Sequence, residues 1–186
     1  NINFKNTSYK PPTSIPTSLY PNNLAAYLGI VRFGSVIDST IINCTFDYCR
    51  PGGLGAAINL CGYGGVCSNI NISYCNFTNC SAGAGGAIYI SGHLAGEGSA
   101  DGRNVNHILI DHCYFEQNQE TSSGARGSAI ELNCQYATVS NSTFVNNYAA
   151  GAGTIGLYKT AGYATIENCS FIGNSALKAG AISAEE

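Results

Sequence analysis

The residues of this sequence that are best suited to chemistry are pairs of carboxylates, because two neighbouring carboxyl groups can cleave a glycosidic bond by acid–base catalysis. Asp111 and Glu167 occupy equivalent positions of the repeat described below, but Ser140 takes that position in the copy between them. Asp47 and Glu116 are separated by an intervening copy in the same way. Carboxyl groups spaced like this do not come close enough for such catalysis or for a shared Ca²⁺ ion. We therefore expect no catalytic residues, no enzymatic activity and no cofactor.

A second group of titratable residues falls in the segment from Ser91 to Asn106, which separates two copies of the repeat. The group consists of His93, Glu97, Asp101 and Arg103, with His107 following it. We interpret the segment as a solvated loop on the outside of the fold. Strand alternation also turns three tyrosines outward, where their rings could stack on sugars: Tyr74, Tyr89 and Tyr114. The loop and these rings are the candidate binding site if the protein is an adhesin.

Nine cysteines are a high content for a chain of this length, and their positions predict two disulfide bonds. Cys61 and Cys67 flank a Gly-rich loop, and Cys49 and Cys80 share one turn position in adjacent copies. A further set shares an inward position, where a free thiol packs as a small hydrophobic group: Cys44, Cys75, Cys113 and Cys169. No CxxC pair occurs together with a second CxxC or His pair, so we expect no metal site.

Asparagines in the Asn-x-Ser/Thr pattern are unusually frequent and predict covalent N-glycans if the protein passes through a eukaryotic secretory pathway. They are Asn6, Asn43, Asn71, Asn76, Asn79, Asn141 and Asn168. Strand alternation turns the six that lie within the repeats toward solvent. Asn43, Asn141 and Asn168 share one position of the repeat, so glycans on them would line one face of the molecule.

All of these residues are organised by one motif that recurs about five times along the chain. Its most conspicuous member is a phenylalanine that returns at spacings of 31, 38, 29 and 27 residues. These phenylalanines are Phe46, Phe77, Phe115, Phe144 and Phe171. A branched apolar residue stands five residues before each phenylalanine, a Cys or Ser two before it, and a Cys or Asn three after it.

A second short strand follows each phenylalanine after a turn rich in Gly and Ala, eleven to fifteen residues further on. These strands are predicted at 57–60, 87–90, 129–132, 154–157 and 181–184. Helical repeats are disfavoured, because no long stretch has a 3.6-residue apolar period. One copy cannot bury its apolar residues alone, but copies stacked about 4.8 Å apart pair every strand in parallel. The sequence predicts an all-β chain, a right-handed single-stranded parallel β-helix (solenoid) of five to six coils.

The repeats divide the chain into three predicted parts. Residues 35–186 form the β-helix, and residues 15–34 form a degenerate first coil or cap. In this first coil Ile15, Ser18, Tyr20 and Asn23 keep the offsets of the repeat, and 28–30 is the expected second strand. Pro16 and Pro21 cannot donate to a strand ladder. Residues 1–14, with two further prolines, are expected to be an extended tail.

Several copies resemble a known family of surface proteins. The segments 115–118, 144–147 and 171–174 read FxxN, and Gly85-Gly86-Ala87-Ile88 reads GGAI. They look like the paired FxxN and GGA[ILV] repeats of polymorphic outer-membrane protein passengers and of related β-helical surface proteins. The resemblance covers residues 35–186, although Cys49 and Cys80 replace the Asn of FxxN. It implies a surface-exposed β-helix used in adhesion, with oligomers or filaments in some members and without enzymatic activity.

Charge and hydropathy exclude two classes of partner. The chain has only 8 Lys and Arg residues and a formal net charge of -3, whereas nucleic acids and anionic membranes require a concentrated basic face. The longest apolar stretch, from Leu24 to Val31, is far shorter than the roughly 20 residues that span a bilayer. We therefore expect a secreted or extracellular protein with no nucleic-acid partner and no membrane insertion.

The function that we expect is structural. The last repeat reaches Glu186 directly after its second strand, with no segment to cover its ladder edge, which favours head-to-tail assembly with a second copy. The tail from Asn1 to Ser14 could clasp the next subunit. The expected protein is thus an extracellular structural glycoprotein, a subunit of a surface filament or fibril. A monomeric or membrane-tethered β-helical adhesin is the alternative, a polysaccharide-acting β-helix enzyme is a weaker one, and the sequence also permits a fragment whose next coils follow.

Overall fold

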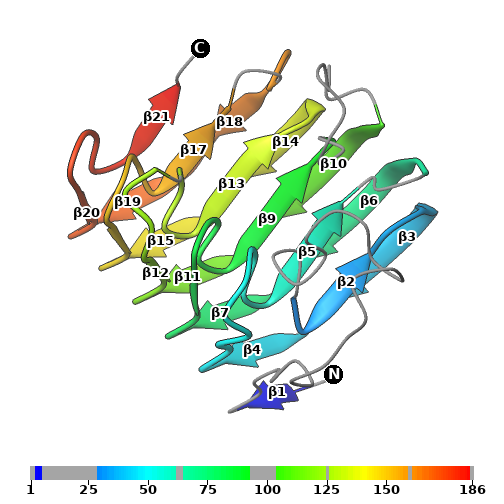
Figure 1. Ribbon diagram of the computed structural model, residues 1–186. Coiled ribbons are helices and arrows are strands. Elements are labelled where there is room, and N and C mark those ends of the chain that lie inside the picture. The colour runs from blue at the N-terminus through cyan, green and yellow to red at the C-terminus, as the bar shows by residue number, and fades with distance from the viewer. Residues whose placement is uncertain are drawn as a thin grey trace, which may run out of the picture.

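The computed structural model describes residues 3–5, 29–61, 65–92, 104–124, 126–158 and 161–184. Throughout these ranges the regular elements are β-strands, and no helix occurs in them. All strand pairs are parallel and join segments from consecutive repeats (Figure 1). The prediction of an all-β chain with parallel sheets is therefore confirmed for the described residues.

The strands of the repeats form four sheets, of which two contain the segments around each phenylalanine. The long-strand sheet holds the residues before the phenylalanine, in β3 (Val36–Ile42), β6 (Cys67–Ser73), β10 (Val105–Asp111), β14 (Gln135–Ser140) and β18 (Thr165–Glu167). The Phe sheet consists of β1 (Asn3–Lys5), β4 (Thr45–Asp47), β7 (Asn76–Thr78), β11 (Tyr114–Glu116), β15 (Thr143–Val145) and β19 (Ser170–Ile172).

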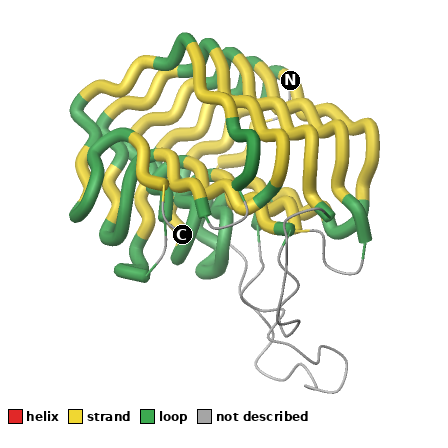
Figure 2. The backbone as a smooth tube through the Cα atoms, turned by 90° about the horizontal axis from the view of Figure 1, so that it is seen from above, coloured by secondary structure: helices red, strands yellow, loops and turns green. Residues whose placement is uncertain are grey.

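The other two sheets follow the phenylalanine. The short-strand sheet consists of β8 (Ser81–Ala82), β12 (Gln119–Glu120), β16 (Tyr148–Ala149) and β20 (Ser175–Ala176). The Ile sheet consists of β2 (Val31–Phe33), β5 (Ile58–Cys61), β9 (Ile88–Ser91), β13 (Ile130–Asn133), β17 (Ile155–Leu157) and β21 (Ile182–Ala184). Viewed at right angles to Figure 1, strands of successive repeats run next to one another and green turns join them (Figure 2).

The register places like residues over like, as predicted. The phenylalanines of consecutive repeats are paired from Phe46 to Phe171. Neighbouring rings are stacked, with centroids 4.8 to 5.0 Å apart and planes within 7° of parallel. The rings from Phe46 to Phe144 are fully buried and form one core with the Ile column of the Ile sheet. Repetition of the sequence thus becomes a continuous core, because each ring is covered by the rings of the two adjacent repeats.

Three positions of each repeat have left-handed backbone conformation, with φ between 48° and 58° at every non-glycine residue. The first column is Asp38, Asn69, His107 and Tyr136, which lie within β3, β6, β10 and β14, followed by Tyr163. The second column, a turn column, is Asn43, Tyr74, His112, Asn141 and Asn168. The third is Tyr48, Asn79, Gln117 and Asn146, continued by Gly173. Asn, Asp and His are enriched in this conformation, whereas Tyr adopts it less often. The neighbouring aromatic members of the first two columns are stacked on one another, with centroids 4.9 to 5.0 Å apart.

The entry into the Ile sheet explains the GGAI motif. Gly85 has a φ of +54°, and a Cβ on it would lie 2.3 Å from the carbonyl oxygen of Ile88. Gly127 has a φ of +94° and would meet the oxygen of Ile130 at 2.0 Å. A side chain at either position would therefore combine an unfavourable backbone conformation with a steric clash.

The beginning of the chain differs from the predicted first coil. The strand opposite β5 is Val31–Phe33, three residues later than the predicted strand at 28–30. Gly29 lies instead against the turn that leads into β5, where a Cβ would be 2.8 Å from the carbonyl oxygen of Gly55. Within the predicted tail, β1 pairs with β4 and places Phe4 opposite Phe46. The predicted offsets from Ile15 to Asn23 lie outside the described residues.

Candidate functional site

The structure keeps the predicted carboxylate pairs apart. Asp111, Ser140 and Glu167 are consecutive partners across three strands of the long-strand sheet. Asp111 accepts hydrogen bonds from Ser140 Oγ at 2.6 Å and Asn141 Nδ2 at 2.8 Å, and lies 2.7 Å from His112 Nδ1. Partial desolvation acts to raise its pKa, but the hydrogen bonds from these three residues outweigh it and lower the pKa to about 2. Asp111 is therefore a stabilised anion and a poor proton donor near neutral pH.

The second pair has the same arrangement. Thr78 lies between Asp47 and Glu116 in the register of the Phe sheet. Asp47 Oδ1 accepts hydrogen bonds from Thr78 Oγ1 at 2.8 Å and Asn79 Nδ2 at 3.2 Å. Asp47 thus binds side chains of the next repeat, and Thr78 separates it from Glu116.

The predicted glycosylation sites within the described residues are accessible to different degrees. Asn43, Asn76, Asn141 and Asn168 are exposed, while Asn71 and Asn79 are half-buried. Asn43, Asn141 and Asn168 belong to the second column of left-handed residues. Asn6 lies outside the described residues, as do His93, Glu97, Asp101 and Arg103 of the predicted loop. Glycosylation of all seven sites stays a prediction.

The cysteines lie where the repeat predicts, and eight of the nine are buried. Cys44, Cys75 and Cys113 point into the core, and Cys169 is partly exposed. Cys49 and Cys80 occupy the same position of adjacent repeats, and both are fully buried, as are Cys61 and Cys67. The disulfide bonds Cys49–Cys80 and Cys61–Cys67 stay predictions.

The three outward tyrosines differ in their surroundings. Tyr74 is 55% exposed and Tyr114 is half-buried, but Tyr89 is only 8% exposed. Tyr89 points away from the Ile sheet as alternation predicts, yet it does not face open solvent. The outer face of this sheet is covered, since every residue of β5, β9 and β13 is buried, including those that point away from the core.

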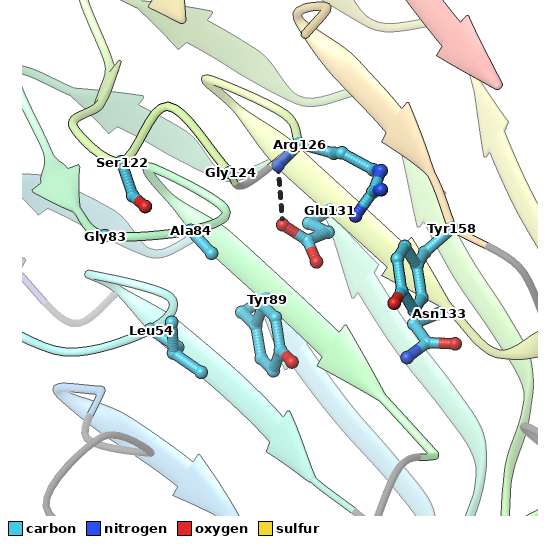
Figure 3. Close-up of a pocket in the computed structure, with 10 residues that line it drawn as sticks. All are labelled: Leu54, Gly83, Ala84, Tyr89, Ser122, Gly124, Arg126, Glu131, Asn133 and Tyr158. Atoms are coloured by element: carbon cyan, nitrogen blue, oxygen red, sulfur yellow. Dashed lines mark hydrogen bonds between the residues drawn. The ribbon is translucent and has the colours of Figure 1, made fainter. Parts of the chain in front are cut away.

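A pocket of about 460 Å³ lies on this covered face (Figure 3). Its lining residues come from four consecutive repeats: Leu54, Gly83, Ala84, Tyr89, Ser122, Gly124, Arg126, Glu131, Asn133 and Tyr158. Glu131 lies between the rings of Tyr89 and Tyr158 in this view, with the guanidinium of Arg126 nearby. The pocket therefore combines aromatic walls with a carboxyl, a guanidinium and an amide group.

An insertion in one repeat creates this pocket. Fifteen residues separate Phe115 from Ile130, against eleven or twelve in the other repeats. The buried carboxylate of Glu120 holds the start of the longer turn, accepting hydrogen bonds from the backbone N–H of Ser122 and, at 2.9 Å, of Gly151. Glu120 thereby positions the segment that brings Ser122 and Gly124 to the rim.

The end of the longer turn lies directly on the sheet. Arg126 packs over Gly156, where a Cβ would be 2.5 Å from the Cβ of Arg126. The guanidinium carbon of Arg126 lies 4.2 Å from the ring centroid of Tyr158, a cation–π contact that orients the charge. The absence of a side chain at Gly156 is therefore what permits this approach.

Glu131 is the buried acid of the pocket, with 6% of its surface exposed. Its Oε2 accepts a hydrogen bond of 3.1 Å from the backbone N–H of Arg126. Burial raises the pKa of Glu131 to about 7, because the hydrogen bond and the positive charge of Arg126 only partly offset desolvation and the negative charge of Glu120 adds to it. Glu131 can thus act as either a hydrogen-bond donor or an acceptor near neutral pH.

The pKa of Glu131 predicts that stability falls with rising pH. The ordinary value is 4.5, so between about pH 4.5 and 7 the folded state retains a proton that the unfolded state has lost. The stabilisation is complete below pH 4.5 and is lost as the pH rises through 7, a loss of about 3 kcal/mol. We expect urea unfolding between pH 5 and 8 to show this slope for the wild type and a smaller one for Glu131→Gln. Equal slopes would contradict the assignment.

Sequence reasoning missed this pocket. The signal was present, since Glu120 and Glu131 break columns that otherwise hold Ala82 and Ala149 or uncharged residues. The longer spacing before Ile130 was a second signal. Strand alternation could place Glu131 and Tyr89 outside the sheet, but it could not indicate that a turn covers them.

Comparisons with protein-family models, with curated proteins and with solved structures found no match to this chain. Within the described residues, no helix is long and apolar enough to cross a membrane. The same residues contain no group of three or more His, Cys, Asp or Glu side chains placed to hold a metal ion. Functional interpretation therefore starts from the geometry of the pocket.

Proposed function

We propose that the chain is a right-handed single-stranded parallel β-helix of the extracellular surface that binds a ligand in the Glu131 pocket, as an adhesin does. Parallel strands joined by crossovers within one sheet are right-handed in nearly all proteins, which supports the handedness. The observation that carries the function is the carboxyl group of Glu131, which is 6% exposed and lines the pocket together with Arg126 and Tyr158.

A purely structural role does not require this acid. Asn59 has the equivalent position in β5, and its Nδ2 donates a 2.8 Å hydrogen bond to the carbonyl oxygen of Leu54, five residues earlier. Glu131 accepts a hydrogen bond from the backbone N–H of Arg126, which is also five residues earlier. A neutral amide suffices for such a hydrogen bond to the turn, whereas burying a carboxyl group costs free energy. The acid is better explained by a ligand, and perturbed acids in pockets are often functional.

The predicted glycans would not cover the pocket. The sequons at Asn43, Asn141 and Asn168 lie in the turn between the long-strand sheet and the Phe sheet. Glycans there would extend from a different part of the surface than the Ile sheet, which carries the pocket. Glycosylation and ligand binding are therefore compatible.

Adhesion by beads coated with the natively secreted protein tests this function. The surfaces are immobilised polysaccharides, glycoproteins and lipid bilayers, and the comparison variant lacks residues 122–125, which shortens the turn to the length found in neighbouring repeats. We expect retention of wild-type beads on at least one surface and loss of retention with the shortened turn, while circular dichroism stays unchanged. Absence of retention, or equal retention by both proteins, would overturn the proposal.

A filament subunit is the second candidate. The edges formed by β18, β19, β20 and β21 have no further partner strand among the described residues. Apolar side chains are exposed near them, with Ile172 at 57%, Leu177 at 77% and Ile182 at 40%. A further repeat, from the same chain or from a second copy, would cover these residues. Electron microscopy of the secreted material tests this candidate: uninterrupted strand spacing across subunits supports it, and separate short rods contradict it.

A further inference from the structure

We infer that the ligand of the Glu131 pocket is an uncharged saccharide, one or two pyranose units held between aromatic walls and a carboxyl–guanidinium pair. This inference rests on the proposed function and adds the chemical class of the ligand. The volume of about 460 Å³ lies within the range of roughly 300–1,000 Å³ that small-molecule sites occupy.

The walls suit the apolar faces of a sugar ring. Tyr89 and Tyr158 come from different strands and flank Glu131, and Leu54 and Ala84 line the same side of the pocket as Tyr89 (Figure 3). The face of an aromatic ring carries partial negative charge, so it attracts the C–H groups of a pyranose. Tyrosine also offers a hydroxyl group at the edge of its ring, where sugar hydroxyls project.

The polar groups suit hydroxyls because they offer both donors and acceptors. Arg126 donates, whereas Glu131 accepts when ionised and can also donate when protonated. Asn133 adds an amide group at the edge of the pocket. A sugar hydroxyl both donates and accepts a hydrogen bond, so each hydroxyl can bind one donor and one acceptor of the pocket.

The charges disfavour ionic ligands of either sign. A cationic ligand would meet Arg126, which the contact with Tyr158 holds in place. An anionic ligand would meet Glu131 and the nearby charge of Glu120, which already acts on Glu131. The opposite charges of Arg126 and Glu131 leave a pocket that is nearly neutral in total and strongly polar locally, as an uncharged polyol requires.

Saturation-transfer NMR on the intact protein tests the ligand class. The probes are maltose, lactose, cellobiose and N-acetylglucosamine as uncharged saccharides, with galacturonic acid as the anion and glucosamine as the cation. We expect saturation of at least one uncharged saccharide and weaker saturation of both ions. Stronger binding of either ion would overturn the uncharged class.

A matched pair of arginine variants tests the location. Arg126→Ala removes the guanidinium over Tyr158, and Arg50→Ala removes one that lies 4.2 Å from the ring centroid of Tyr48, outside the pocket lining. We expect Arg126→Ala to weaken saccharide binding about tenfold or more and Arg50→Ala to change it less than about twofold. Equal effects would place the saccharide elsewhere and overturn the inference.

Glu131→Gln provides the second variant if Arg126→Ala does not fold. Its amide oxygen can still accept the N–H of Arg126, so the turn is retained while the carboxyl is lost. We expect Glu131→Gln to bind the saccharide more weakly than the wild type and with an affinity that does not change between pH 5 and 8. Unchanged saccharide binding would contradict the role of Glu131. If no saccharide binds but bead adhesion still depends on residues 122–125, the ligand class is wrong and the adhesive function stands. If bead adhesion also fails, the function itself is wrong.

Discussion

Replacement of Phe115 by alanine is expected to lower the free energy of unfolding by about 3–5 kcal/mol. Phe115 is fully buried, and its ring is stacked between those of Phe77 and Phe144, each at a centroid distance of 4.8 Å. Removing it leaves a cavity in the middle of the column, which stacked backbones 4.8 Å apart cannot close without breaking strand pairs. Urea unfolding followed by circular dichroism measures the change.

Tyr148→Ala is the control for this variant. Tyr148 is an aromatic residue in β16 of the following repeat, but 49% of its surface is exposed. We expect a loss of less than about 1 kcal/mol, since substitutions of exposed residues have small effects. Comparable losses for the two variants would show that the phenylalanine column contributes no special stability.

The pairing register could be predicted from the sequence because stacking imposes it. Phe77, Phe115 and Phe144 are paired as their spacing requires, although the two spacings differ by nine residues. The loops accommodate these differences in length, and the core requires equivalent residues of consecutive repeats to lie over one another. The same logic predicted the inward Cys44, because core positions recur with the phenylalanine.

Regions where the repeat is degraded could not be placed as well. The predicted strand at 28–30 had the right composition, but Gly29 packs against Gly55 and the strand begins at Val31. Phe4, which pairs with Phe46, lies 27 residues before Val31, whereas 11 to 15 residues separate the phenylalanine from the Ile sheet in the other repeats. Phe4 therefore fixes the position of this short apolar segment less closely. Register there depends on close backbone contacts, which composition does not reveal.

The pocket could not be predicted for a different reason. The alternation of a strand tells which side of its sheet a residue faces, and it correctly turned Tyr89 away from the core. It says nothing about a neighbouring turn that folds over the outer face, as the segment before Arg126 does. The consequence is that Tyr89 is 8% exposed and lines a pocket with Glu131, which was not recognised as a candidate.

The position three residues after the phenylalanine leads to a second large effect. Asn118 is fully buried, and its Nδ2 donates to the carbonyl oxygen of Phe77 at 2.9 Å and to Oδ1 of Asn147 at 3.0 Å. Its Oδ1 accepts the backbone N–H of Cys80 at 3.0 Å. Each amide thus joins three consecutive repeats, and Asn147 repeats the pattern with Asn174. The FxxN motif is explained by this ladder, which needs a donor and an acceptor on one side chain.

Asn118→Asp is therefore expected to lower the free energy of unfolding by about 3–5 kcal/mol at pH 8 although it changes the side-chain volume little. The new oxygen faces the oxygens of Phe77 and Asn147, and an ionised carboxylate has no proton to give either of them. Burial and these acceptors favour the protonated form, so part of the loss should be recovered as the pH falls toward 4, in the direction that applies to any acid whose folded pKa is raised. Urea unfolding at pH 8 and pH 4 measures the loss and its recovery. Asn146→Asp is the control, because Asn146 is an exposed turn residue and Asp also tolerates its φ of 51°. A loss at pH 8 no larger than that of the control would mean that the amide ladder does not hold the repeats together, and that the stacked rings and backbone pairs suffice.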